Sequence, residues 1–198
     1  MDTKKMNTKK MNTKKMVVSA LFLAMGMILP MITMQIPAIG NMLLPMHIPV
    51  LLCGFVCGAP YGAIIGFVLP LFRSAIFGVP VMMPMAVAMA VELMVYGLAS
   101  GVLYRVLKAV RGKIYISLVI TMLLGRISWG IVSWGLYTLL GSEFSWKIFV
   151  TQAFVNAVPG IVIQFILVPV IVVAVEKQYK EGKYEGKVDN KRHMPKAF

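Results

Sequence analysis

No lysine, arginine, aspartate or glutamate occurs anywhere between Val17 and Phe72. This uncharged run is far longer than one transmembrane helix requires, because about 20 apolar residues cross the hydrocarbon core of a bilayer. Hydrophobic residues make up 59% of the 198-residue chain and charged residues only 14%, whereas charged residues make up about 25% of a soluble domain. A soluble fold of this size has too little interior to bury such a sequence. The sequence therefore predicts an all-α membrane protein with several transmembrane helices.

Proline- and glycine-containing turns divide the apolar sequence into six predicted transmembrane helices. Their approximate ranges are 17–36, 43–58, 61–78, 82–104, 114–140 and 148–175. The second span is short and could be re-entrant or strongly tilted. Because the number of spans is even, both termini are expected on one side of the membrane. We predict three regions: a basic low-complexity tail over 1–15, a six-helix membrane domain over 16–176 and a charged cytoplasmic tail over 177–198.

The net charge of +13 is concentrated where the predicted spans end. The lysines and arginines gather in the N-terminal repeat TKKMNTKKMNTKKM, in the loop between the fourth and fifth spans, and in the C-terminal tail. Basic residues flanking transmembrane helices mark the cytoplasmic side, so we predict that both termini are cytoplasmic and that the repeat is a topogenic anchor. Anionic lipid would also be attracted to these clusters. This distribution argues against a nucleic-acid partner.

Three ionisable residues fall well inside the predicted spans: Arg73, Glu92 and Arg126. Each costs roughly 2.5–3.5 kcal/mol at the centre of an inserted helix. With a rise of about 1.5 Å per residue, all three fall in one layer at or just outside the midplane, and Asn156 on the sixth span falls near it. The plain interpretation is a structural ion pair between Glu92 and one arginine. The other arginine then predicts a site for a small anionic or zwitterionic ligand, since an unpaired buried guanidinium is strongly disfavoured.

Two further residues are candidates for this site. Trp129 follows Arg126 by three residues and so lies near the same helix face. His47, like Gln35, flanks the first outer loop and is a candidate for a lid. For each of these side chains the alternative is an ordinary position at the membrane interface.

Motifs for catalysis within this chain are absent. The sequence contains neither a P-loop nor a G-x-S-x-G nucleophile motif. Glu92 is the only acid inside the spans, and Cys53 and Cys57 have only His47 nearby as a further metal ligand. We therefore predict a ligand-binding transport protein rather than an enzyme, without a metal or cofactor of its own.

Several segments resemble the substrate-binding S components of energy-coupling factor (ECF) vitamin transporters. They are SALFLAMGMILP, LLPMHIPVLLCGFVCGAPYG, GFVLPLFRSAIFG and MAVAMAVELMVYGLASGVLYR, and the resemblance covers about residues 16–176. It implies a six-helix protein that binds a vitamin near its outer face and docks on a transmembrane T component coupled to two cytoplasmic ATPases, which use the ATP. It also implies that Ala20 and Ala24 form the docking surface.

The excess of cations over anions in the predicted layer favours an anionic vitamin such as pantothenate, and the chain is similar to both pantothenate-type and cobalamin-type S components. A cobalamin site would be wider and would depend less on an arginine–carboxylate contact. The alternative from another class is a self-sufficient secondary carrier with Glu92 as a proton relay. Internal repeats would favour that alternative, and the sequence has none that is convincing.

Overall fold

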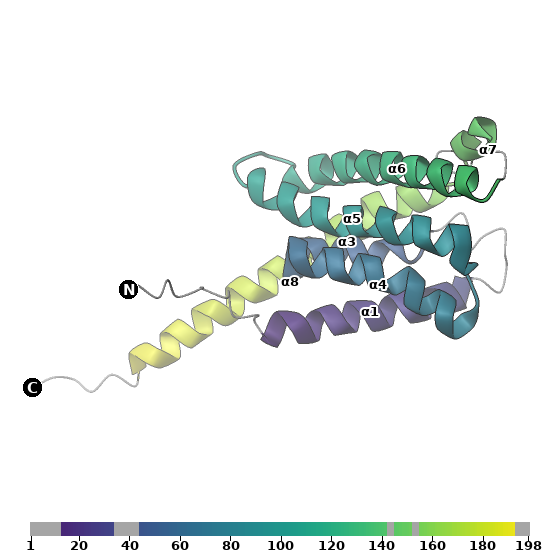
Figure 1. Ribbon diagram of the computed structural model, residues 1–198. Helices are drawn as coiled ribbons and strands as arrows, with labels where there is room; N and C mark the ends of the chain where they lie inside the picture. The colour runs from purple at the N-terminus through teal and green to yellow at the C-terminus, as the bar shows by residue number, and fades with distance from the viewer. Residues whose placement is uncertain (1–12, 34–43, 142–144, 152–154, 193–198) are drawn as a thin grey trace, which may run out of the picture.

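The computed structural model describes residues 13–33, 44–141, 145–151 and 155–192, and every regular element within them is a helix. The elements are α1 (Thr13–Thr33), α3 (His47–Cys57), α4 (Ala59–Phe77), the short π-helical turn η1 (Met82–Ala86), α5 (Val87–Val106), α6 (Lys113–Leu139), α7 (Trp146–Val150) and α8 (Val158–Arg192). In Figure 1 α1, α4 and α5 run roughly lengthwise through one bundle, whereas α8 crosses it obliquely and extends beyond it. The predicted all-α class is confirmed.

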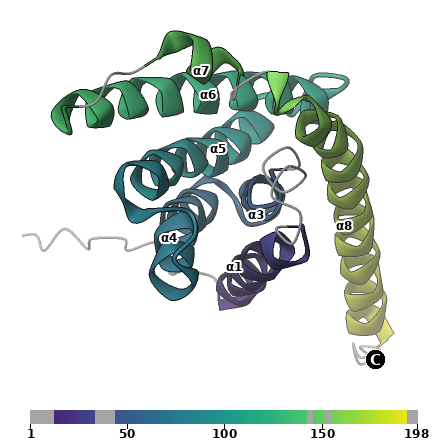
Figure 2. The same cartoon turned by 90° about the vertical axis from the view of Figure 1, so that its right-hand side faces the viewer.

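Five helical segments are long and apolar enough to cross a membrane: α1, α4, η1 with α5, α6, and the first part of α8. The protein is thus a multi-pass membrane protein. The second predicted span is α3, whose 11 residues extend only about 16 Å. Ten of them are buried, because α1, α4, α5 and α8 all contact this helix. Figure 2 shows α3 surrounded by the other helices.

The sixth predicted span, 148–175, is wrong in its boundaries. The structure has a short helix, α7, then a turn containing Asn156, and only then α8. Proline lacks a backbone N–H and is favoured in the first helical turn, where that group would have no intrahelical partner. Pro159 stands at the second residue of α8, whereas Pro169 lies in the interior of the same helix. At the other end α8 continues through the charged segment to Arg192, which was predicted as a tail from residue 177.

Glycines bring α4 and α5 into backbone contact. A Cβ atom at Gly62 would lie 2.6 Å from the carbonyl oxygen of Gly97, and one at Gly97 would overlap the carbonyl oxygen of Gly62. Gly66 lies equally close to the backbone of Leu93. In lipid no hydrophobic force drives helices together, so small residues that permit close packing stabilise the contact. This pair is the most extensive helix contact among the described residues, and it fixes the position of α5, which carries Glu92.

We expect Gly97→Ala to lower the free energy of unfolding by about 1–3 kcal/mol, because the added methyl group meets backbone that cannot rotate away. The measurement is denaturant- or heat-induced unfolding of the purified protein in detergent. The matched control is Gly135→Ala in α6, where a Cβ atom has no neighbour within 4 Å. Alanine favours helix over glycine by up to about 1 kcal/mol, so this control should be neutral or stabilising. Equal effects of the two variants would contradict the close-packing argument.

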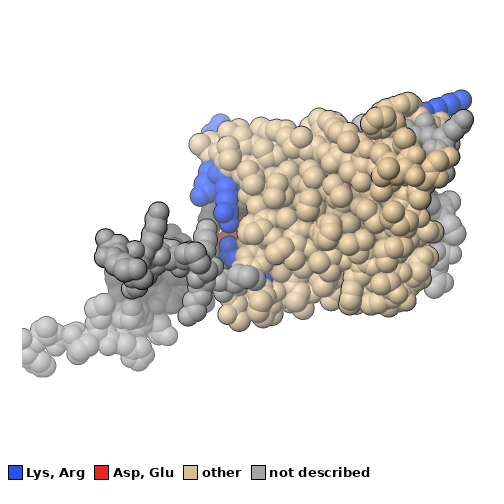
Figure 3. All heavy atoms as spheres, viewed as in Figure 1, with Lys and Arg blue, Asp and Glu red and all other residues tan. Residues whose placement is uncertain are grey.

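Charged side chains gather at the two ends of the bundle. The end where α1 begins carries Lys15, Arg105, Lys108, Arg111 and Lys113, and we call it the basic end. The opposite end, where α4 finishes and α7 lies, is called the far end. On the face shown in Figure 3, blue side chains appear only at these ends, and an uncharged band lies between them.

Candidate functional site

A buried ionic cluster joins three helices in the interior. Arg126 Nη1 of α6 lies 3.0 Å from Glu92 Oε1 of α5, and His47 Nε2 at the start of α3 lies 3.4 Å from the same oxygen. Glu92 and His47 are each 1% exposed and Arg126 is 6% exposed. The arginine partner of Glu92, which the sequence left open, is therefore Arg126. We call these three residues the ionic cluster.

Aromatic packing sets the positions of its members. Tyr96 lies one turn after Glu92 on α5, is 2% exposed, and packs edge-to-face against the His47 ring with 5.0 Å between ring centroids. On the other side its ring lies against Gly125, where a Cβ atom would overlap it. The absence of a side chain at position 125 thus lets α6 approach Tyr96 closely and brings Arg126 to Glu92.

Several nitrogen atoms of the ionic cluster have no hydrogen-bond partner among the described residues. They are Nε and Nη2 of Arg126 and both ring nitrogens of His47. Glu92 Oε1 is within ion-pair distance of both residues, yet neither contact is aligned as a hydrogen bond. A buried donor without a partner costs roughly 1–3 kcal/mol, and more when it is charged. The buried nitrogen atoms of the ionic cluster can therefore donate hydrogen bonds to an acceptor that lies outside the described residues.

Arg73 lies elsewhere in the bundle. It is 3% exposed, its Nη1 donates to the carbonyl oxygen of Met27 on α1 over 2.7 Å, and its guanidinium lies 5.3 Å from the centre of the Phe77 ring. The ionisable residues that were predicted to share one layer therefore belong to two separate groups of contacts. Glu92 and Arg126 meet through α5 and α6, while Arg73 connects α4 to α1.

The other predicted site residues have mixed positions. Trp129 is half-buried and stacks on Phe149 of α7 with ring centroids 5.3 Å apart, so α7 covers the α6 face one turn beyond Arg126. His47 was considered for a lid or an interface, and it is instead buried in the cluster. Asn156 is half-buried in the turn before α8, so it does not lie on a helix as predicted. Gln35 lies outside the described residues.

Several buried polar residues were missed, among them Tyr96 and Gln164. Tyr96 is part of the packing around the ionic cluster, and its position one turn after Glu92 was the available signal. Gln164 of α8 is 1% exposed, and its side-chain nitrogen has no partner among the described residues. The sequence feature that could have identified Gln164 is a single amide side chain in an otherwise apolar segment.

The cysteines show no arrangement for metal binding. Cys53 and Cys57 are buried and are not joined in a disulfide, and the thiol of Cys53 lies 3.5 Å from Ser19 Oγ. Within the described part of the chain, no group of three histidine, cysteine or acidic side chains is placed to hold a metal ion.

Comparison with known proteins supplies the family. A family described as "ECF transporter, substrate-specific component" matches residues 14–172, which covers α1 through most of the apolar part of α8. Comparisons with curated proteins and with solved structures give no match. The match spans well over half of the chain and includes every member of the ionic cluster, and members of this family are transporter subunits rather than enzymes. The chain therefore belongs to the substrate-specific components of ECF transporters.

Proposed function

We propose that this S component binds a small anionic vitamin, with pantothenate as the best candidate, through the ionic cluster. The observation that carries the proposal is the pair of buried Arg126 donors, Nε and Nη2, that have no partner among the described residues. A guanidinium binds a carboxylate through two parallel hydrogen bonds. Glu92 already balances the arginine's charge at Nη1, so it holds the guanidinium in place while the other edge remains available.

The surrounding residues offer further contacts to a small ligand. His47 adds ring nitrogens next to Arg126, and Trp129 with Phe149 adds an aromatic surface one turn away. Arg73 remains a second cationic candidate on the α4 side, and Asn156 a candidate at the far end. Cobalamin is the alternative vitamin, and it would need contacts well beyond this compact cluster.

We further propose six membrane crossings, with α3 as the short second one and with the basic end in the cytoplasm. Lysine and arginine next to membrane spans favour the cytoplasmic side, and α1 begins and α8 finishes toward that end (Figure 1). The far end then faces outward, where ligand arrives. The chain itself holds no cofactor in this proposal. ATP is used by two partner ATPases, which act through a transmembrane T component.

Docking on the T component is assigned to Ala20 and Ala24 of α1. Both are exposed in the isolated chain, and only 22% of the most apolar part of α1 is buried inside the bundle. A face of small side chains allows another helix to approach closely in the membrane. The remaining exposed apolar surface faces lipid, and nucleic acid has no part in this function.

Ligand titration with matched variants tests the site. Arg126→Lys keeps a positive charge beside Glu92 but removes the planar fork of donors. We expect the Kd for pantothenate to rise about 10- to 100-fold, because hydrogen bonds to charged groups contribute about 1.5–3 kcal/mol. Panthenol, which has a hydroxymethyl group in place of the carboxylate, should bind weakly to both forms. Isothermal titration calorimetry in detergent is the measurement, with the exposed Arg111→Lys as control.

Three results would contradict parts of this proposal. Equal affinity for pantothenate and panthenol would exclude the carboxylate contact, and tight binding of cobalamin alone would replace the substrate. Uptake by the chain alone in proteoliposomes under an ion gradient would favour the secondary carrier, because an S component without its partners should bind ligand but not transport it.

A further inference from the structure

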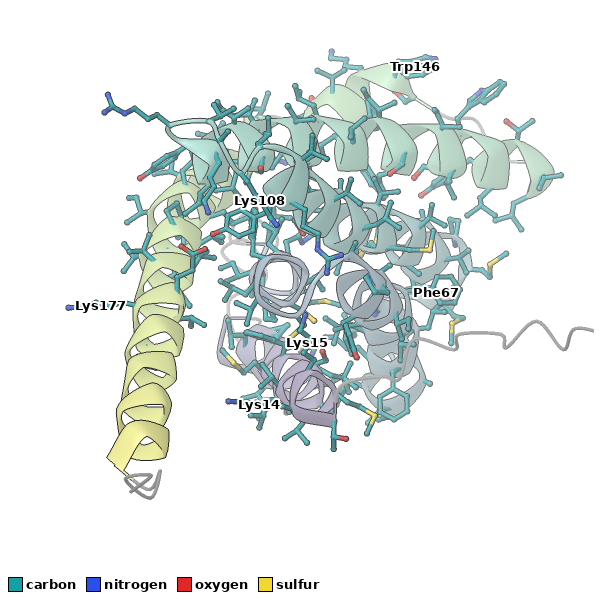
Figure 4. All side chains as sticks on the ribbon, turned by 90° about the vertical axis from the view of Figure 1, so that its left-hand side faces the viewer. Lys14, Lys15, Phe67, Lys108, Trp146 and Lys177 are labelled. Carbon is teal, nitrogen blue, oxygen red and sulfur yellow. The ribbon has the colours of Figure 1, made fainter. Side chains whose placement is uncertain are left out.

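The last lysine pair of the N-terminal repeat is split between two environments. Lys15 is half-buried, and its Nζ donates to the backbone carbonyl of Cys57 over 3.1 Å. Its neighbour Lys14 is exposed. In Figure 4, which views the basic end, the Lys15 side chain points into the bundle toward α3 and the Lys14 side chain points away from it. A topogenic role alone would not distinguish the two positions.

Lys15 contacts the C-terminus of α3, where backbone carbonyl groups need hydrogen-bond donors. Cys57 is the last residue of α3. The N–H of the next residue, Gly58, donates to the carbonyl oxygens of Cys53 and Gly54. Carbonyl groups at a helix C-terminus lack intrahelical partners, and the helix dipole makes this end negative. A lysine ammonium is suited to both features. Lys15 therefore acts as a C-terminal cap for α3 that is supplied by a different helix.

Both apolar and polar contacts hold α1 against the bundle. Phe22 is 9% exposed and belongs to the hydrophobic core, and Val18 and Leu23 pack against that core. Ser19, one turn after Lys15, meets Cys53, Gly26 lies against the Leu69 side chain, and the Met27 carbonyl accepts the hydrogen bond from Arg73. Cationic side chains thus make polar contacts at the first turn of α1 and at Met27, with side-chain packing between them. The core packing of α1 begins at Val18, so the Lys15 contact adds a point of attachment in the first turn of the helix.

We propose that Lys15 is a positioning residue for docking on the T component. By holding the first turn of α1 on the end of α3, it sets the direction in which Ala20 and Ala24 face, one and two turns further along. The inference rests on the proposed docking role of these alanines, and it gives the third TKKM copy a function beyond topology. Without the contact, the start of α1 can rotate, and association must first restore its orientation.

The test compares Lys15→Gln with Lys14→Gln, which remove the same charge from adjacent positions. The measurement is the Kd between the full-length S component and its T component–ATPase module in lipid nanodiscs. We expect the Kd to rise about tenfold for Lys15→Gln, as for the loss of one hydrogen bond to a charged group, and to change less than about twofold for Lys14→Gln, as for an exposed charge. Lys15→Arg retains a donor of similar reach and should restore most of the affinity.

Two further measurements make the outcomes distinguishable. Equal Kd values for the two glutamine variants, or no rescue by arginine, would overturn the role of Lys15. So would a lower unfolding temperature of the isolated Lys15→Gln chain that arginine does not correct, since that indicates a general loss of folding. Ala24→Trp is included as a reference: if it leaves the Kd unchanged, the docking proposal itself fails and this inference with it, whereas an effect there with equal glutamine variants overturns only the inference.

Discussion

Ala24→Trp, or equally Ala20→Trp, should reduce vitamin uptake to background in cells that contain the complete transporter. Both alanines are exposed on α1, and a tryptophan there holds a partner helix away by the width of an indole ring. Close approach is what makes small residues effective in membrane interfaces, so the loss should be nearly complete rather than graded. The proposed ligand site, the ionic cluster, lies on α3, α5 and α6, and affinity for ligand should remain unchanged. Radiolabelled uptake and titration of the purified chain are the two measurements.

Val170→Trp is a suitable control for this prediction. Val170 is 62% exposed on α8, so tryptophan there adds the same bulk to a surface that we assign to lipid. Uptake should stay near the wild-type level in this variant. Normal uptake by the alanine variants, or equal loss in Val170→Trp, would count against docking through α1.

Arg126→Leu should lower the free energy of unfolding by about 3–5 kcal/mol, the usual cost of removing one partner from a buried ion pair. Glu92 is 1% exposed, and after the substitution its other charged neighbour would be His47 at 3.4 Å, which carries a charge only when protonated. The measurement is unfolding in detergent, by heat or denaturant. The exposed Arg111→Leu at the basic end is the control and should have an effect below about 0.5 kcal/mol.

The double variant Glu92→Leu with Arg126→Leu separates pairing from packing. Replacing both members of a buried ion pair by apolar residues is often neutral or stabilising, so this variant should recover most of the lost stability. It should nevertheless bind no pantothenate, because the guanidinium is gone. A double variant as unstable as Arg126→Leu would show that the arginine stabilises the fold through contacts other than Glu92.

Individual residues show which structural features the sequence predicted correctly and which it did not. The long uncharged run and the basic clusters predicted a membrane protein correctly. The segment predicted as a short second span contains the 11-residue helix α3, which is not among the five helices long enough to cross a membrane. Asn156 was misplaced because an unbroken apolar run was taken as one helix, although Pro159 favours a helix start at that point. His47 was expected near a lid or interface, since nothing in the residues around it shows that α3 is enclosed by four other helices.

Spacing along the sequence gives the depth of a side chain, because each helical residue adds about 1.5 Å along the axis. It therefore singled out Arg73, Glu92 and Arg126, all of which are buried in the bundle. It does not give the rotation of a helix or its neighbours, because in lipid an apolar side chain can face either a helix or the membrane. Only the tertiary structure decided that Glu92 meets Arg126 and His47, while Arg73 meets the Met27 carbonyl. The physical reason is close packing: the glycine contacts of α4 with α5 and of Gly125 with Tyr96 set which helix faces meet.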